Sequence, residues 1–212
     1  MKMILKNKAK FKLKFDVLNK KTYFIFLISL FVTGILSGII FFVLLNNAGK
    51  EEIINNINSY FTLSDNYNYL SILFDNLKNN FLNVFLLWIL GISVIGIFII
   101  IFLYFMEGFS MGFIISSIFY SFKYKGIVGS ILYLFPGKLL YLLIMFILTF
   151  FAGIFSYHLI KNIIKKEEQS LNIYFRKYLK ILGLCLIFAL LVSFFETFIT
   201  PLMIKVWTIL IK

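Results

Sequence analysis

The chain of 212 residues contains a single cysteine, Cys185, and a single histidine, His158. One cysteine excludes a disulfide within the chain and a metal site built from cysteine ligands, and one histidine excludes a histidine cluster. The sequence also lacks a Gly-rich phosphate loop, an HExxH pair, a serine–histidine–aspartate set and a pair of acids at catalytic spacing. It therefore predicts no enzyme, no cofactor and no metal.

Charged residues are scarce as well. They make up 14% of the chain, and hydrophobic residues make up 61%, whereas about a quarter of the residues in a soluble domain are charged. Several apolar runs have about 20 residues, the length that crosses a bilayer as a helix. The net charge of +12 would suggest nucleic acid in a soluble protein, but here the lysines cluster beside the apolar runs. The sequence therefore predicts an all-α polytopic membrane protein that binds no nucleic acid.

Residues 1–22 form a basic arm in which eight lysines accompany a single acid, Asp16. Lysine and apolar residues alternate between Lys8 and Phe15, which is the period of a strand, but an isolated strand has no partner to pair with. We expect the arm to lie in the cytoplasm, where its lysines are attracted to anionic lipid headgroups. A site for a cytosolic partner is the alternative.

Five apolar segments are predicted to cross the membrane within one transmembrane domain, residues 23–212. They cover residues of about 23–45, 81–105, 107–122, 138–160 and 181–204. The outer loop, 46–80, has room for two short amphipathic helices, which either lie on the bilayer or dock a partner. The inner loop, 161–180, is basic.

The stretch between the third and fourth predicted spans is broken. Lys123 and Lys125 interrupt it, and the apolar run 126–135 that follows is too short to cross. Pro136 ends this run, because proline disfavours a helical conformation at the residue before it. We expect a short re-entrant or interfacial helix here, with its backbone covered by protein or water.

Small residues recur on the predicted spans and indicate close helix packing. They are Gly34, Gly38, Gly91, Gly96, Gly108, Gly112 and Ser116. Most of them are spaced four residues apart, whereas Gly91 and Gly96 are five apart and share a face less well. For Gly34 and Gly38 two interpretations remain open, packing within the chain and dimerisation.

Glu196 is the foremost candidate for a functional residue, because an acid exposed to lipid within a span costs several kcal/mol. It shares one helix face with three small side chains, Ala189, Ser193 and Thr200. Glu196 is either a buried functional acid or an acid near the outer end of the span. In the second case it reaches interfacial water or pairs with a nearby lysine, either Lys138, Lys205 or Lys123.

Three further residues are structural or partner-binding candidates. Glu107 is placed at the inner junction of the second and third spans, where an acid favours the positive N-terminal end of a helix. A transport or docking role is the alternative for it. Pro136 marks the break described above, and Pro201 is expected to kink or end the last span about one turn after Glu196.

Basic residues indicate the orientation of the chain. With five spans and the N-terminus inside, the arm and the 161–180 loop place most lysines and arginines on the cytoplasmic side. The positive-inside rule therefore predicts a multi-pass protein of the cell membrane with its N-terminus in the cytoplasm and its C-terminus outside.

Four stretches together resemble the stage II sporulation protein M family. They are Leu86–Gly96, Gly108–Phe113, Leu134–Pro136 and Phe195–Pro201. The length and the five-span layout are similar to the family over nearly the whole chain. Pro136 is followed by Gly137 and Lys138, which departs from the family pattern.

The resemblance implies a membrane scaffold of the engulfment machinery in endospore-forming bacteria. Such a scaffold would assemble or localise peptidoglycan hydrolases at the septum, with stage II sporulation proteins D and P as partners. A small transporter or channel that uses Glu196 and the broken helix near Pro136 is the rival interpretation, because a fold alone does not decide function.

Overall fold

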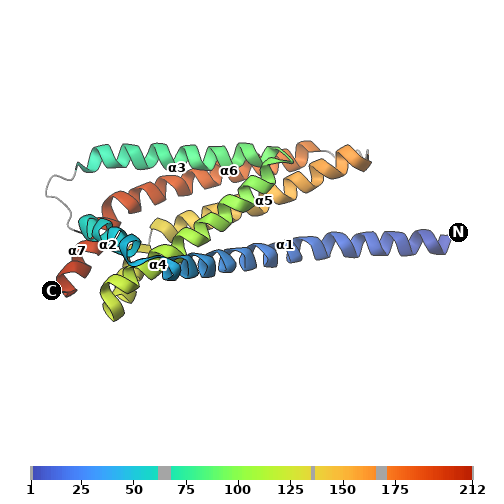
Figure 1. Ribbon diagram of the computed structural model, residues 1–212. Helices are drawn as coiled ribbons and strands as arrows, with labels where there is room; N and C mark the ends of the chain where they lie inside the picture. The colour runs from blue at the N-terminus through green and yellow to red at the C-terminus, as the bar shows by residue number, and fades with distance from the viewer. Residues whose placement is uncertain (1, 62–67, 135–136, 166–170, 212) are drawn as a thin grey trace.

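A computed structural model of the chain describes residues 2–61, 68–134, 137–165 and 171–211 (Figure 1). For residues 2–19, 57–61, 133–134, 163–165, 171 and 208–211 it describes the backbone alone. The elements are α1 (Lys2–Leu44), α2 (Asn47–Phe61), α3 (Tyr69–Ile92), α4 (Gly96–Leu134), α5 (Gly137–Lys165), α6 (Leu171–Phe194), the π-helical turn η1 (Phe195–Ile199) and α7 (Thr200–Ile211). The described residues are helical apart from short connections, which confirms the all-α prediction.

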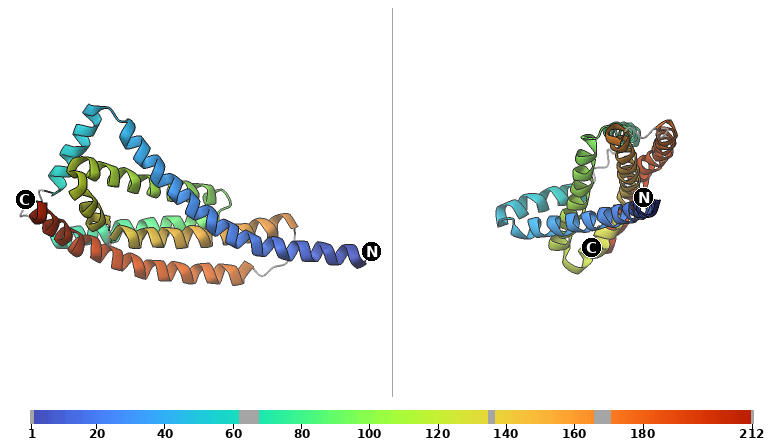
Figure 2. Two further views of the ribbon diagram at one scale, coloured as in Figure 1. Left: turned by 90° about the horizontal axis from the view of Figure 1, so that it is seen from below. Right: turned by 90° about the vertical axis from the view of Figure 1, so that its right-hand side faces the viewer.

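Four helical stretches are long and apolar enough to cross a membrane. They are Lys20–Leu44, Gly96–Leu132, Gly137–Asn162 and Asn172–Trp207. These confirm a polytopic membrane protein. With 24 residues α3 is also long enough, at about 36 Å, but it carries more polar side chains. The long helices run back and forth along one bundle, and the two chain ends lie at opposite ends of it (Figures 1 and 2).

The predicted boundary between the second and third spans is wrong. Helix α3 ends at Ile92, and α4 begins at Gly96 and continues through residue 107. Ser93 forms the turn between them, because its N–H donates to the Leu90 carbonyl and its hydroxyl accepts from the Gly96 N–H at 3.4 Å. Gly96 lies so close to the Leu90 carbonyl that a side chain at this position would collide with it. Gly96 therefore shapes the turn between α3 and α4 and is not a packing position along a span.

Both predicted loops are shorter than expected. Helix α2 matches the first amphipathic helix of the 46–80 stretch, whereas the second is the beginning of α3. Likewise α5 continues to Lys165 and α6 begins at Leu171, within the predicted 161–180 loop. The arm belongs to α1 from Lys2 onward, and its contact with lipid stays a prediction.

Helix α4 bends sharply at Lys123, which has φ 51° and ψ −130°. After the bend, residues 124–134 fold back, so that Gly126 lies against the Ile118 carbonyl. Trp207 of α7 then covers this segment, with its ring against Gly129 and its indole N–H donating to the Lys125 carbonyl at 3.2 Å. A short helix therefore follows Lys123, as predicted, while Pro136 lies outside the described residues.

Helices α1 and α4 cross at four glycines. Gly34 and Gly38 of α1 face Gly108 and Gly112 of α4, and a Cβ added at Gly34 would lie 2.6 Å from the Phe105 carbonyl oxygen. At Gly38 and Gly112 an added Cβ would also collide with a backbone carbonyl of the facing helix. The two backbones are thus in direct contact, and this packing lies within one chain.

The remaining core joins α3, α5 and α6. Tyr178 of α6 is buried, stacks on Trp88 of α3 with ring centroids 5.7 Å apart, and donates its hydroxyl to the Trp88 carbonyl at 3.1 Å. The Tyr178 hydroxyl lies over Gly91, which leaves no room for a larger residue. Phe155 of α5 stacks on the other side of Tyr178 at 5.3 Å. These contacts place α3 and α6 side by side, which positions the site described next.

Candidate functional site: a polar cluster between the helices

Polar and charged side chains from α3, α4, α5 and the α6–η1 segment meet inside the bundle. This polar cluster consists of Asn76, Asn80, Glu107, Lys138, Tyr141, Ser193, Glu196 and Thr197. All of them except Asn76 and Asn80 lie within the four apolar candidate spans. Side chains of this kind are costly in a membrane unless they engage one another.

Asn80 links α3 to the last span. Its Nδ2 donates to the Ser193 hydroxyl at 2.9 Å and to Glu196 Oε2 at 3.1 Å. One turn earlier, Asn76 donates to the Thr197 hydroxyl at 3.0 Å. The Asn80, Ser193 and Thr197 side chains are buried. Two asparagines spaced four residues apart therefore fasten α3 to the segment that carries Glu196.

The π-helical turn sets the register of Glu196. Within this turn Thr200 donates its backbone N–H, and also its side-chain hydroxyl at 3.2 Å, to the carbonyl of Phe195, five residues back. A π-turn inserts one extra residue and often marks a functional site. It lies directly before Pro201, whose ring would crowd the carbonyl four residues earlier in a regular α-helix. The helix consequently continues through Pro201 as α7, and Pro201 does not end it.

Three small side chains share the buried face of this segment. Ser193 donates to the Ala189 carbonyl and Thr197 donates to the Ser193 carbonyl, so Ala189, Ser193 and Thr197 form the buried stripe. Glu196 lies beside this stripe and is half-buried. The sequence pattern missed Thr197, because it followed spacings of four, three and four residues from Ala189 through Ser193 and Glu196 to Thr200.

The start of α5 closes the cluster from another side. A Cβ added at Gly137 would lie 2.7 Å from Cγ of Glu196, so a larger residue here would displace the Glu196 side chain. Lys138 follows, with its Nζ 5.6 Å from the centre of the Tyr141 ring. The Tyr141 hydroxyl is a hydrogen-bond partner of the Asn83 side chain. Lys138, one of the three lysines proposed for Glu196, thus lies in the cluster, where it interacts electrostatically with Glu107.

Glu107 belongs to the same cluster, because it lies well inside α4 and not at a span junction. Its half-buried carboxyl interacts electrostatically with the Lys138 ammonium and with the Glu196 carboxyl. Lys138 therefore partly compensates the charge of Glu107, which also lies near the like charge of Glu196. The location at the end of a helix, which the sequence indicated, is wrong, because the turn at Ser93 moves the junction away.

The polar cluster connects several helices and contains charged side chains within the bundle. Five polar side chains come from α3 and the α6–η1 segment, and a further three from α4 and α5. Within the described part of the chain, no group of three or more histidine, cysteine or acidic residues could hold a metal ion.

Sequence reasoning brought out Glu107 and Glu196 but not the two asparagines of the cluster. Asn76 and Asn80 are spaced four residues apart and continue, toward the start of α3, the buried face that Val84 and Leu87 occupy. That spacing could have indicated the two asparagines, but the predicted span began after Asn80, so both residues were assigned to the outer loop.

A scan against known families matches the model of stage II sporulation protein M over residues 26–201. The chain belongs to this family. The match runs from Phe26 in α1 to Pro201 in α7 and includes every residue of the polar cluster. As a member of the stage II sporulation protein M family, it is a membrane protein related to sporulation. No curated protein and no solved structure matches the chain.

Proposed function

We propose that this member of the stage II sporulation protein M family is a membrane scaffold of the engulfment machinery. It assembles or localises peptidoglycan hydrolases at the septum, and stage II sporulation proteins D and P are its partners. In this proposal the protein lies in the cell membrane with its N-terminus in the cytoplasm and its C-terminus outside, and the basic arm binds anionic lipid.

The family match over residues 26–201 is the observation that carries this proposal. The proposal is also supported by the polar side chains, because they connect helices to one another. Asn80 joins α3 to Ser193 and Glu196 of the α6–η1 segment, and glycines bring α1 against α4. These groups therefore fix the helices relative to one another. A rigid bundle with preset helix positions is what a platform for other membrane proteins requires.

Affinity purification from sporulating cells tests the proposal. A tagged copy is expected to enrich stage II sporulation proteins D and P over an untagged strain. The Glu196→Gln variant is expected to insert normally and to lose this enrichment, because the charge that interacts with Glu107 is gone. Glu51→Gln, at an exposed position of α2 outside the polar cluster, removes one charge and serves as the matched control. A complex without wall hydrolases would contradict the scaffold.

A specific observation supports a second candidate, a small transporter or channel. Glu107, Lys138 and Glu196 are charged and lie within membrane-spanning segments, where ionisable residues often mark a pathway for ions or solutes. Purified protein in liposomes distinguishes the two. Ion or solute flux that depends on Glu196 favours transport, whereas absence of flux together with loss of partner recruitment in Glu196→Gln favours the scaffold.

A further inference from the structure

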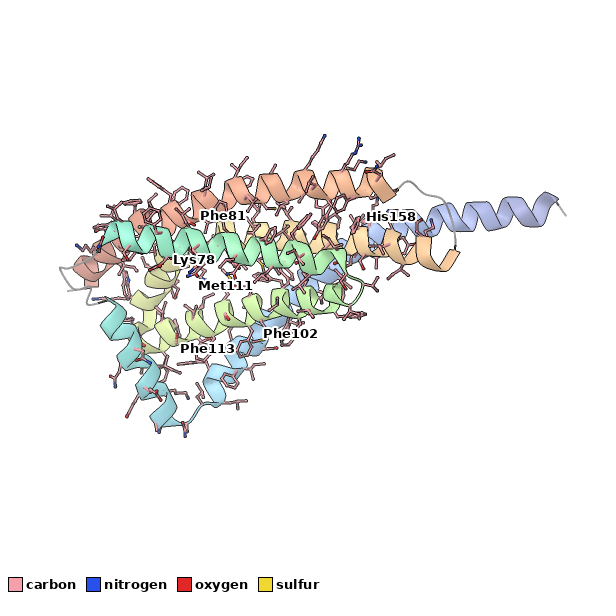
Figure 3. All side chains as sticks on the ribbon, turned by 90° about the horizontal axis from the view of Figure 1, so that it is seen from above. Lys78, Phe81, Phe102, Met111, Phe113 and His158 are labelled. Atoms are coloured by element: carbon pink, nitrogen blue, oxygen red, sulfur yellow. The ribbon has the colours of Figure 1, made fainter. Side chains whose placement is uncertain are left out.

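The bundle is broader at one end than at the other. Helices α3 and α4 lie together at the Ser93 turn, where the Ser93 hydroxyl accepts from the Gly96 N–H, and they diverge toward their other ends (Figure 3). Helices α2 and α7 and residues 124–134 all lie at the end where α3 and α4 are apart (Figures 1 and 2). We call this end the broad end, and we call the end with the Ser93 turn the narrow end.

The extra width comes from helical segments that follow the spans. Helix α2 comes after α1, residues 124–134 follow the bend at Lys123, and α7 follows the π-turn. The candidate span Asn172–Trp207 has 36 residues, about 54 Å as a helix, whereas the hydrocarbon core of a bilayer is about 30 Å thick. At the narrow end residues 93–95 join α3 to α4 directly. The broad end therefore places more protein in its leaflet than the narrow end places in the other leaflet.

Helix α2 has the side chains of a helix at the level of the lipid headgroups. Four of its polar residues are exposed, and two isoleucines between them are half-buried. The exposed residues are Glu51, Glu52, Asn55 and Asn56, and the isoleucines are Ile53 and Ile54. An amphipathic helix at the membrane interface lies in one leaflet only, and its interaction with lipid is sensitive to curvature. The position of α2 therefore adds to the difference between the two ends.

Contacts between helices make the broad end rigid. Lys50 of α2 donates from Nζ to the Val43 carbonyl of α1 at 2.9 Å, and this Nζ lies 5.6 Å from the centre of the Tyr120 ring of α4. Trp207 of α7 packs edge-on against Phe122 of α4, with ring centroids 4.7 Å apart. These contacts connect α2 to α1 and α4, and α4 to α7. The surrounding lipid consequently has to adapt to the shape of the protein.

We propose that this protein prefers curved membrane in which the leaflet around α2 and α7 is the convex one. A bilayer deforms around a protein that does not match it, at a modest cost. Curvature that expands the leaflet around the broad end reduces this cost, because that leaflet then has more area for protein. With the predicted orientation of the chain, the convex side is the outer side of the cell membrane. The proposal goes beyond the scaffold role and does not depend on which proteins the scaffold recruits.

Membrane tubes pulled from giant vesicles test this preference. The full chain is reconstituted alone in a Cys185→Ala background, and Glu51→Cys places a thiol at an exposed position of α2. An impermeant fluorescent thiol reagent then labels only the copies whose broad end faces outward, which is the convex side of the tube. Their fluorescence relative to a lipid dye is expected to be about twofold higher in the tube than in the vesicle wall, and to rise as the tube narrows.

Copies in the opposite orientation are the matched control. Lys20→Cys places the thiol at an exposed position of α1 toward the narrow end, so the same reagent labels the copies whose narrow end faces outward. These copies are expected to be depleted in the tube by a similar factor. Equal concentrations in tube and vesicle wall overturn the proposal. Enrichment of both orientations overturns it as well, because a preference that ignores orientation does not come from the shape of the protein.

A further pair of variants tests whether the broad end has to be rigid. Lys50→Ala removes the hydrogen bond to the Val43 carbonyl and the cation beside the Tyr120 ring. It is expected to reduce the enrichment of the Glu51→Cys copies while the helix content measured by circular dichroism is unchanged. Glu52→Ala, at an exposed position of the same helix, is expected to keep the enrichment. Equal enrichment in the two variants overturns the role of the Lys50 contacts.

Discussion

At the scale of single residues, glycines determine the helix packing as much as the larger side chains do. Gly34, Gly38, Gly108 and Gly112 let two backbones touch, and Gly137 leaves room for Glu196. Without a hydrophobic effect between helices in lipid, van der Waals contact and interhelical hydrogen bonds carry the association. The Asn80 bonds to Ser193 and Glu196 are such a link.

Substitution of Gly38 by alanine tests the α1–α4 contact. The new methyl group would collide with the Phe109 carbonyl, which is backbone and cannot swing away, so the helices must separate. We expect a loss of about 1–3 kcal/mol in the free energy of unfolding, measured by denaturant titration in detergent.

Gly183→Ala is the control for this substitution, because no atom lies within 4 Å of the position that its Cβ would take. It is expected to be neutral or to stabilise by up to about 1 kcal/mol through helix propensity. Equal effects of the two substitutions would contradict the close α1–α4 crossing.

At the scale of elements, two irregular turns decide where helices point. The π-turn before Pro201 keeps the last span continuous. The bend at Lys123 sends the end of α4 back toward α7. A non-glycine residue with positive φ is uncommon, and the ψ of −130° places Lys123 in a region that glycine adopts far more easily.

Lys123→Gly is therefore expected to stabilise the protein by about 1 kcal/mol, because it relieves a backbone conformation that costs about 1–3 kcal/mol for a residue other than glycine. Lys125→Gly, two residues on, replaces a residue without positive φ and should destabilise by about 1 kcal/mol. Thermal unfolding of the purified variants measures both. The same sign for both substitutions would speak against the bend.

At the scale of the whole molecule, the two ends of the chain lie at opposite ends of the bundle (Figure 2). Together with the lysine-rich N-terminal arm, this arrangement leads us to expect the N-terminus in the cytoplasm and the C-terminus outside.

Labelling of intact cells tests this orientation. In a Cys185→Ala background, which removes the only cysteine of the sequence, a cysteine at position 212 is expected to react with an impermeant thiol reagent. A cysteine at position 2 is expected to react only after the cells are opened. Protection of position 212 in intact cells would exclude the proposed topology.

The sequence by itself determined the class of the protein, its family and its most costly residue. Membrane embedding depends on the number and length of apolar runs, which are read directly from the order of residues along the chain. Glu196 stood out for the same reason, since an acid in such a run needs a partner wherever the fold places it. Glycines spaced four apart indicated close packing, but not which helix would meet them.

Only the tertiary structure decided where the helices turn and what Glu196 touches. The turn at Ser93 lies inside an unbroken apolar run, so hydropathy placed the junction near Glu107. The partners of Glu196 come from positions 80, 107 and 137, each far from it in sequence. Contacts of this kind arise from the crossing of distant helices, and a local pattern of residues does not encode them.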